Sequence, residues 1–134
     1  MDFGYVNDES TLVQTAVHKN KLYAKELLYE KGLSTDEIVR RLDGLITDRN
    51  SLIVADNAEP RLIDEIRAKG FNIVPCHKGK DSVRLGLVKM MDYKIVVDPN
   101  SRNIVKELNN YVWDDKKSNT PKSNGYDHLI DALR

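Results

Sequence analysis

The most constraining feature of this sequence is a continuous apolar run at residues 51–56, SLIVAD, which ends in a carboxylate. Strands that are buried on both faces have such runs, because helices cover both sides of the sheet. Two shorter runs, FNIV at 71–74 and KIVV at 94–97, follow at intervals that leave room for a helix before each. This part of the chain is therefore expected to alternate helices with strands.

The segments between these runs carry apolar residues at helical spacing. Ser34 with Glu37 three residues later predicts a capping box at the start of one helix. Pro60 suits the first turn of the next, because proline is tolerated where no helical hydrogen bond is donated. Helices are thus predicted from Ser34, from Pro60 to Gly70, from Asp81 to about Met91, and from Ser101.

The start of the chain has extended character instead. Residues 2–7, 11–18 and 22–29 are rich in strand-forming side chains and are separated by turn residues, which favours an antiparallel meander of three strands. The polar residues 114–124, DDKKSNTPKSN, are expected to form a flexible loop, because they have nothing to bury. An α/β fold follows, with a mixed sheet flanked by helices, and this order of elements is that of the ribonuclease H-like architecture.

Composition excludes several classes of protein. A chain of 134 residues suits one domain, and its 21 basic and 21 acidic residues give no bulk charge that would indicate a nucleic-acid binder. The single cysteine excludes an internal disulfide and indicates a reducing compartment; with only three histidines it also disfavours structural zinc. No apolar run has the length of a membrane span, and no signal-peptide pattern opens the chain.

The closing residues 125–134, GYDHLIDALR, predict a short amphipathic helix. On a helical wheel Asp127, His128 and Asp131 fall on one arc, opposite the leucine and isoleucine side chains. Such a cluster suits Mg²⁺ or Mn²⁺, because hard divalent cations prefer oxygen ligands. The alternative is an ordinary helix with a solvated acidic face, and this stretch alone does not decide between them.

Two further acids stand at positions with structural meaning. Asp2 lies on the first predicted strand, and Asp56 lies at the C-terminal end of the fourth, where α/β sheets place their sites. If those strands are neighbours and the last helix crosses beside them, both acids meet Asp131. Close carboxylates repel one another, and a divalent cation removes that conflict. Two metal ions about 3.5–4 Å apart can stabilise both oxygens of phosphodiester cleavage. The alternative is that Asp2 and Asp56 merely cap a strand and a helix.

Five segments, in order, resemble the C-terminal nuclease domain of large terminase subunits from tailed bacteriophages and prophages. They are DFGYVND at 2–8, VADNAEP at 54–60, HKGKDSV at 77–83, ELNNYVW at 107–113 and DHLIDALR at 127–134. The resemblance covers nearly the whole chain. It implies a ribonuclease H-like nuclease that uses Mg²⁺ or Mn²⁺ and cuts concatemeric double-stranded phage DNA during packaging, in the cytoplasm of the bacterial host.

The resemblance also implies roles for particular residues. Asp2, Asp56 and Asp131 correspond to the metal-binding acids, with Asp2 the best bridging ligand because a central strand would hold it rigidly. His128 corresponds to the family's histidine, which could bind a metal ion, orient a water or carry a proton. Asp127 is a further, less central candidate for the metal.

The loop between the strand at 71–74 and the next helix carries basic residues. Lys78, Lys80 and Arg84 are expected to contact the phosphates of DNA, which positions a duplex without reading its sequence; a solvated basic turn is the alternative. The Gly-Lys pair in this loop is not a P-loop, because Val74 and Asp81 stand where glycine and a hydroxyl residue are required.

Two departures from the family pattern concern the ends of the chain. Only Met1 precedes Asp2, so Asp2 is expected at a frayed strand end, which would weaken metal binding. The chain stops at Arg134, directly after the last motif. We therefore expect residues 1–134 to be a single nuclease domain without its ATPase domain, either excised or a prophage remnant. In the whole terminase, its partners would be the ATPase domain, the small terminase subunit and the portal.

Two other functions remain open at this point. The domain could be a catalytically weak or inactive packaging module, if its first strand is truncated. It could also be another ribonuclease H-like nuclease, such as a junction resolvase, whose preferred substrate would be a four-way junction.

Overall fold

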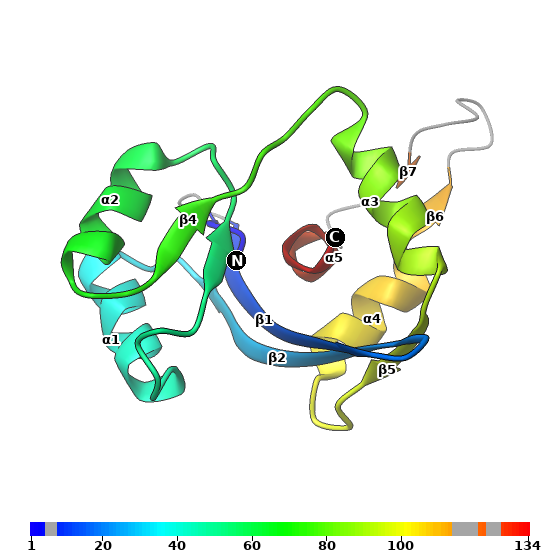
Figure 1. The fold of residues 1–134 in the computed structure, drawn as a ribbon, viewed down its shortest axis with the longest axis horizontal. Helices are drawn as coiled ribbons and strands as arrows, with labels where there is room; N and C mark the ends of the chain where they lie inside the picture. The colour runs from blue at the N-terminus through cyan, green and yellow to red at the C-terminus, as the bar shows by residue number, and fades with distance from the viewer. Residues whose placement is uncertain (5–7, 114–120, 123–126) are drawn as a thin grey trace.

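The computed structural model describes residues 1–4, 8–113, 121–122 and 127–134. The helices and most of the strands follow the predicted order (Figure 1). Of the strand predicted at 2–7, the described residues 2–4 form only an isolated bridge at Asp2, and the next two strands are longer than predicted. Their bounds are β1 Glu9–His18, β2 Lys21–Lys31, α1 Thr35–Leu45, β3 Ile53–Ala55, α2 Pro60–Ala68, β4 Ile73–Pro75, α3 Ser82–Met91, β5 Lys94–Val97, α4 Arg102–Asn110, β6 Val112–Trp113, β7 Pro121–Lys122 and α5 His128–Leu133.

Strand pairing gives the mixture of antiparallel and parallel strands that the sequence predicted. β1 and β2 form a long antiparallel hairpin, and β5 adds to β2 in parallel. β3 and β4 form a separate parallel pair. The hairpin turns at Lys19, whose φ of 55° lies in the left-handed region. The register shifts between Leu12 and Val13, which leaves Leu27 of β2 as an extra residue; such a bulge increases the local twist of its strand.

Met1 and Asp2 connect these two groups of strands. The backbone nitrogen of Met1 donates to the Val54 carbonyl at 2.7 Å, and Asp56 N–H donates to the Met1 carbonyl at 3.0 Å, so this segment runs beside β3. Asp2 and Thr11 exchange both backbone hydrogen bonds, at 3.0 and 2.8 Å, which is antiparallel pairing with β1. The predicted first strand is thus a neighbour of both the second and the fourth.

Met1 is buried, with 6% of its surface exposed, and its backbone is paired. The expectation that Asp2 sits at a frayed strand end is therefore wrong, because β3 holds the residue before it in register. Residues 5–7 of the predicted first strand lie outside the described part of the chain.

Helices pack on the strands in two groups. α1 and α2 lie beside β3 and β4, whereas α3 and α4 lie near β5, and α5 is seen end-on between the two groups (Figure 1). The capping box is present: the Glu37 carboxylate accepts from the Ser34 N–H at 2.9 Å. The first group is packed around Ile38, Leu42, Ile53, Ile63, Ile66 and Ile73. The second is packed around Leu22, Leu87, Met90 and Ile130.

The structure differs from the prediction near the C-terminus. Pro121–Lys122 pair as β7 with Val112–Trp113, so this part of the predicted loop at 114–124 is a strand. Residues 114–120 and 123–124 lie outside the described part. The pairing has no local signal, because two-residue strands show no periodicity. Among the described residues, no helix combines the length and apolar character needed to cross a bilayer.

Candidate functional site

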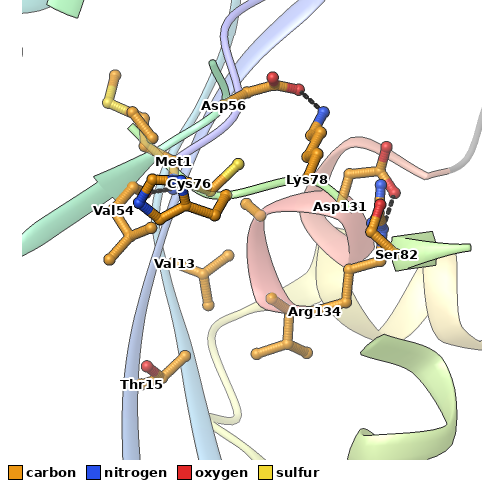
Figure 2. A pocket seen from close by; sticks show the side chains of 14 residues that line it. Met1, Val13, Thr15, Val54, Asp56, Cys76, Lys78, Ser82, Asp131 and Arg134 are labelled. Carbon is orange, nitrogen blue, oxygen red and sulfur yellow. Dashed lines mark hydrogen bonds and ion pairs between the residues drawn. The ribbon is translucent and has the colours of Figure 1, made fainter. Parts of the chain in front are cut away.

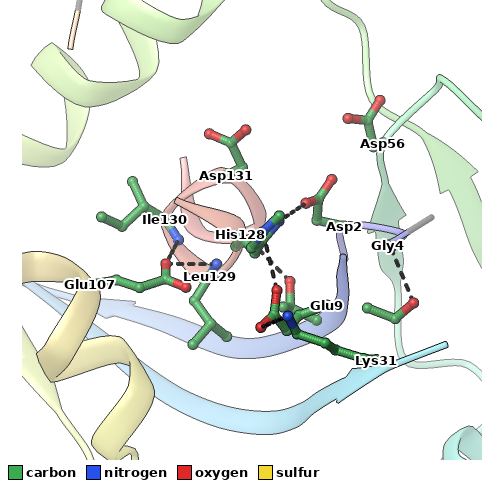
Figure 3. A network of polar contacts seen from close by, with 12 residues as sticks. Asp2, Gly4, Glu9, Lys31, Asp56, Glu107, His128, Leu129, Ile130 and Asp131 are labelled. Carbon is green, nitrogen blue, oxygen red and sulfur yellow. Dashed lines mark hydrogen bonds and ion pairs between the residues drawn. The ribbon is translucent and has the colours of Figure 1, made fainter. Parts of the chain in front are cut away.

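The short helix α5 is held in place by contacts from α4 and β1. The buried carboxylate of Glu107 accepts the backbone N–H groups of Leu129 and Ile130 at 2.8 and 3.0 Å (Figure 3). The Thr11 hydroxyl donates to the carbonyl of His128 at 3.0 Å. Leu129 and Ile130 are themselves buried, as the wheel predicted. These contacts fix the end of the helix that presents the acidic arc.

Three predicted acids lie together at the junction of these elements. Asp2 belongs to the N-terminal segment, which lies in space between β1 and β3. Asp56 follows β3, and Asp131 lies on α5. In Figure 3 the side chain of Asp2 lies between those of Asp131 and Asp56. Burial, followed by the charges of Asp131 and Asp56, raises the pKa of Asp2 to about 6, while His128 acts in the opposite direction. The three carboxylates therefore form one electrostatic unit.

Asp56 is held by two donors. Lys78 forms an ion pair with Oδ2, and the N–H of Ala58 donates to Oδ1 at 2.9 Å (Figure 2). Although burial acts to raise it, the hydrogen bonds from Lys78 and Ala58 lower the pKa of Asp56. Lys78, which is predicted to bind DNA phosphate, therefore neutralises Asp56, a predicted metal ligand, in this structure.

Asp131 has a similar basic partner. Arg134 Nε donates to Asp131 Oδ1 at 2.6 Å, and only 8% of the arginine side chain is exposed. Despite its burial, the hydrogen bond to Asp131 raises the pKa of Arg134. Asp56, Lys78, Asp131 and Arg134 line one cavity of about 390 Å³, together with Ser82 at the start of α3 (Figure 2).

His128 lies between two carboxylates. Its Nδ1 is 3.7 Å from Asp2 Oδ2, and its Nε2 is 3.3 Å from Glu9 Oε2 (Figure 3). Glu9 is also 3.3 Å from Lys31 Nζ on the neighbouring strand. The sequence pattern places Glu9 in a turn and gives it no function; it is instead the first residue of β1. No local pattern could have revealed it, because its partner lies at the far end of the chain.

The remaining predicted residues are less closely tied to Asp2. Asp127 precedes α5, and its charge acts on Glu107, whereas the main charges that shift the pKa of Asp2 are those of Asp131 and Asp56. Lys80 and Arg84 are exposed, just before and within the first turn of α3. They can therefore meet a ligand approaching the cavity, although the structure does not bring them to the carboxylates as it does Lys78.

The donor chemistry of this site fits a hard divalent cation, because the charges of Asp131 and Asp56 act against the ionisation of the buried Asp2 carboxylate, and a cation would relieve that repulsion. Their present positions are not those of a formed metal site: no group of three or more His, Cys, Asp or Glu side chains in the described part is arranged to hold an ion. Lys78 and Arg134 pair with two of the acids instead. To bind metal ions, Asp56 and Asp131 would have to release Lys78 and Arg134.

Fold and site together define a ribonuclease H-like domain with an acidic site at the end of the central strands. The family model for the terminase RNase H-like domain matches residues 2–134, so the chain belongs to that family. This confirms the family that the five motifs indicated. The sequence is 32% identical over 112 residues to the PBSX phage terminase large subunit of Bacillus subtilis (strain 168), covering 81% of this chain. The chain spans about a quarter of that relative, 25% of its length.

Two solved structures have the same fold. The nuclease domain of the g2p large terminase from bacteriophage SPP1, with bound Mn, superposes with a TM-score of 0.81 at 30% identity, covering 98% of this chain and 78% of that one. The large terminase of a thermophilic bacteriophage superposes with a TM-score of 0.73 at 21% identity, covering 98% of this chain and 36% of that one. The second likeness shows the fold alone.

Proposed function

We propose that this domain is a metal-dependent endonuclease that cuts double-stranded concatemeric phage DNA during genome packaging. The observation that carries the proposal is the meeting of Asp2, Asp56 and Asp131, which come from three separate parts of the chain. Its relative from SPP1 is a nuclease domain with bound Mn, which supports Mn²⁺ or Mg²⁺ as the cofactor.

The acids have distinct parts in this proposal. Divalent metal ions would supply positive charge to the attacking and leaving oxygens of the phosphodiester, which is the chemistry of two-metal sites. Asp2 is the most buried and most confined of the three acids, so it is suited to a shared, bridging position. Asp56 and Asp131 would each hold one ion. Asp127 is the candidate that contributes least, because it precedes α5 and its charge is not one of the main causes of the raised pKa of Asp2.

His128 faces Asp2 through Nδ1, so its imidazole can orient a water or accept a proton beside the buried acid. Lys78, Lys80 and Arg84 would contact phosphates along the approach to the cavity. Lys78 would have two roles. It neutralises Asp56 in the metal-free protein, and it would move to a DNA phosphate when Asp56 binds metal.

The setting of this activity is proposed from the relatives. In a whole large terminase the domain would work with an ATPase domain, the small terminase subunit and the portal, in the cytoplasm of the bacterial host. Residues 1–134 would be the nuclease unit of that assembly.

Plasmid nicking tests the assignment. Wild-type protein with Mn²⁺ is expected to convert supercoiled plasmid to nicked and linear forms, whereas Asp56→Ala and Asp131→Ala should lose nearly all of this activity, because each removes a proposed metal ligand. Asp64→Ala is the matched control, since this exposed acid pairs with Arg67 on its own helix, α2. Equal cutting by the wild type and both site variants would show that the site is misassigned.

A second candidate is a packaging module without nuclease activity. A frayed strand at Asp2 would have favoured this candidate, but Met1 and Asp2 are paired with β3 and β1. One observation still favours it: Lys78 and Arg134 already neutralise Asp56 and Asp131. Calorimetry on folded protein decides, because this candidate predicts no heat of Mn²⁺ binding. A preference for four-way junctions over linear duplex would instead favour a junction resolvase.

A further inference from the structure

The imidazole of His128 has a carboxylate at each nitrogen. Glu9 Oε2 lies 3.3 Å from Nε2, closer than the 3.7 Å that separates Asp2 Oδ2 from Nδ1. All three side chains are at least four-fifths covered: 19% of His128 and 15% of Asp2 and Glu9 are exposed. Water therefore competes little for the imidazole protons, and the two carboxylates decide where a single proton resides.

Glu9 is itself held in one orientation. It is the first residue of β1 and stands directly opposite Lys31 in the register of the hairpin. Lys31 Nζ lies 3.3 Å from Oε1, whereas His128 faces Oε2 (Figure 3). The Tyr29 hydroxyl also donates a hydrogen bond to this carboxylate. The strand pair thus presents a fixed acceptor to the far nitrogen of the imidazole.

We infer that Glu9 is a positioning residue that accepts the Nε2 proton of His128 and so leaves Nδ1, the nitrogen facing Asp2, free of a proton. A histidine that binds a metal ion must offer an unprotonated nitrogen, and the partner of its other nitrogen sets which one that is. This inference rests on the proposed function for its purpose, because Nδ1 is the nitrogen on the side of the predicted metal site.

The arrangement also explains why a second carboxylate is needed. Asp2 alone would draw the single proton to Nδ1, since it would be the one acid beside the ring. Nδ1 would then donate to Asp2 and be closed to a metal ion. Glu9 reverses that preference from the opposite side.

Nitrogen NMR on metal-free, ¹⁵N-histidine-labelled protein tests the inference, at a pH high enough that the ring signals no longer change and the imidazole carries a single proton. His128→Gln identifies the resonances of His128 among those of the three histidines. The wild type is expected to carry its proton on Nε2. Glu9→Ala shifts the population toward Nδ1–H, and Glu9→Gln, whose amide oxygen can still accept, retains Nε2–H. Glu30→Ala is the matched control, because it removes a carboxylate of β2 that pairs with Arg41 instead.

Calorimetry with Mn²⁺ alone gives the second readout. Glu9→Ala is expected to weaken binding about 10- to 100-fold, the usual effect of losing such an outer partner. Glu9→Gln should recover most of that loss, and Glu30→Ala should bind as the wild type does. Wild-type tautomer and affinity in Glu9→Ala would overturn the inference. So would an equal loss in both Glu9 variants with an unchanged tautomer, because Glu9 would then be a direct ligand. If the wild type binds no Mn²⁺, the proposed function fails, and the tautomer still decides the part played by Glu9.

Discussion

Asp2 bears the main electrostatic cost of the site. It is largely covered, and the charges of Asp131 and Asp56 both act against its ionisation. Acids at functional sites often have such raised pKa values, because the arrangement suits a ligand rather than the metal-free fold. The metal-free domain should therefore be less stable than its core alone would allow.

Replacement of Asp2 by asparagine should stabilise the metal-free protein in a pH-dependent way. The folded pKa of about 6 lies above the ordinary 3.8, so the contribution of Asp2 to stability is complete below about pH 4 and lost as pH rises through 6. At pH 8, Asp2→Asn should raise the free energy of unfolding by up to about 3 kcal/mol. Urea unfolding with a chelator measures it. A gain of the same size at pH 4, or none at pH 8, would contradict this account.

Lys78 is predicted to compete with a metal ion for Asp56. Lys78→Met should strengthen Mn²⁺ binding in the absence of DNA by about two- to five-fold, because an ion pair near the surface contributes up to about 1 kcal/mol. The same variant should bind plasmid DNA more weakly. Lys80→Met is the control and should weaken DNA binding alone. Unchanged Mn²⁺ affinity in Lys78→Met would mean that its pairing with Asp56 does not limit metal entry.

The site residues that could be predicted from the sequence lie within recognisable motifs. Asp56 ends an apolar strand, and Asp131 lies on the polar arc of a helix, so pattern and family resemblance together indicated both. Glu9 lies outside the five motifs, and Arg134 lies in the last one without a predicted role. Their roles arise from tertiary contact with His128 and from the way α5 ends beside Asp131. That Asp2, Asp56, Asp131 and His128 bind metal stays a prediction.

At the scale of elements, α5 depends on its neighbours. Its six residues, His128–Leu133, are too few for a helix to be stable alone. Glu107 supplies the acceptor that the first turn lacks, although its other oxygen, Oε1, has no hydrogen-bond partner among the described residues. The position of His128 and Asp131 therefore depends on a buried side chain of α4.

Loss of the Glu107 carboxylate should release α5 from α4. Glu107→Ala is expected to cost about 1.5–3 kcal/mol, because two buried N–H groups lose a charged acceptor. Glu107→Gln should cost less, since its amide oxygen can accept. Hydrogen exchange at Leu129 and Ile130 reports the effect directly, and urea unfolding gives its size. Asn109→Ala, on the exposed face of α4, is the control. Unchanged protection at both amides in Glu107→Ala would refute this coupling.

Elements with a local signal were predictable, and those built by distant pairing were not. The capping box of α1 and the proline at the start of α2 placed those helices correctly, because both signals act within one turn. β7 has no such signal: Pro121–Lys122 become a strand only by pairing with β6. The same holds for Met1, whose burial beside β3 reversed the expectation of a frayed end.

For the whole molecule, the Met1–Asp2 segment is the join between two groups of strands. It pairs with β3 on one side and with β1 on the other, and α5 packs beside it. This topology brings residues 2, 56 and 131 together, and it matches the fold of the SPP1 nuclease domain over 98% of the chain. We propose that a divalent metal ion binds at this junction.

Anomalous diffraction from a crystal of the domain soaked in Mn²⁺ tests that claim most directly. We predict a manganese peak coordinated by carboxylate oxygens of Asp2, Asp56 and Asp131, with Lys78 and Arg134 turned away from their present partners. A second peak beside the first would identify the two-metal arrangement. Manganese bound elsewhere on the domain, or no peak at this junction at saturating Mn²⁺, would contradict it.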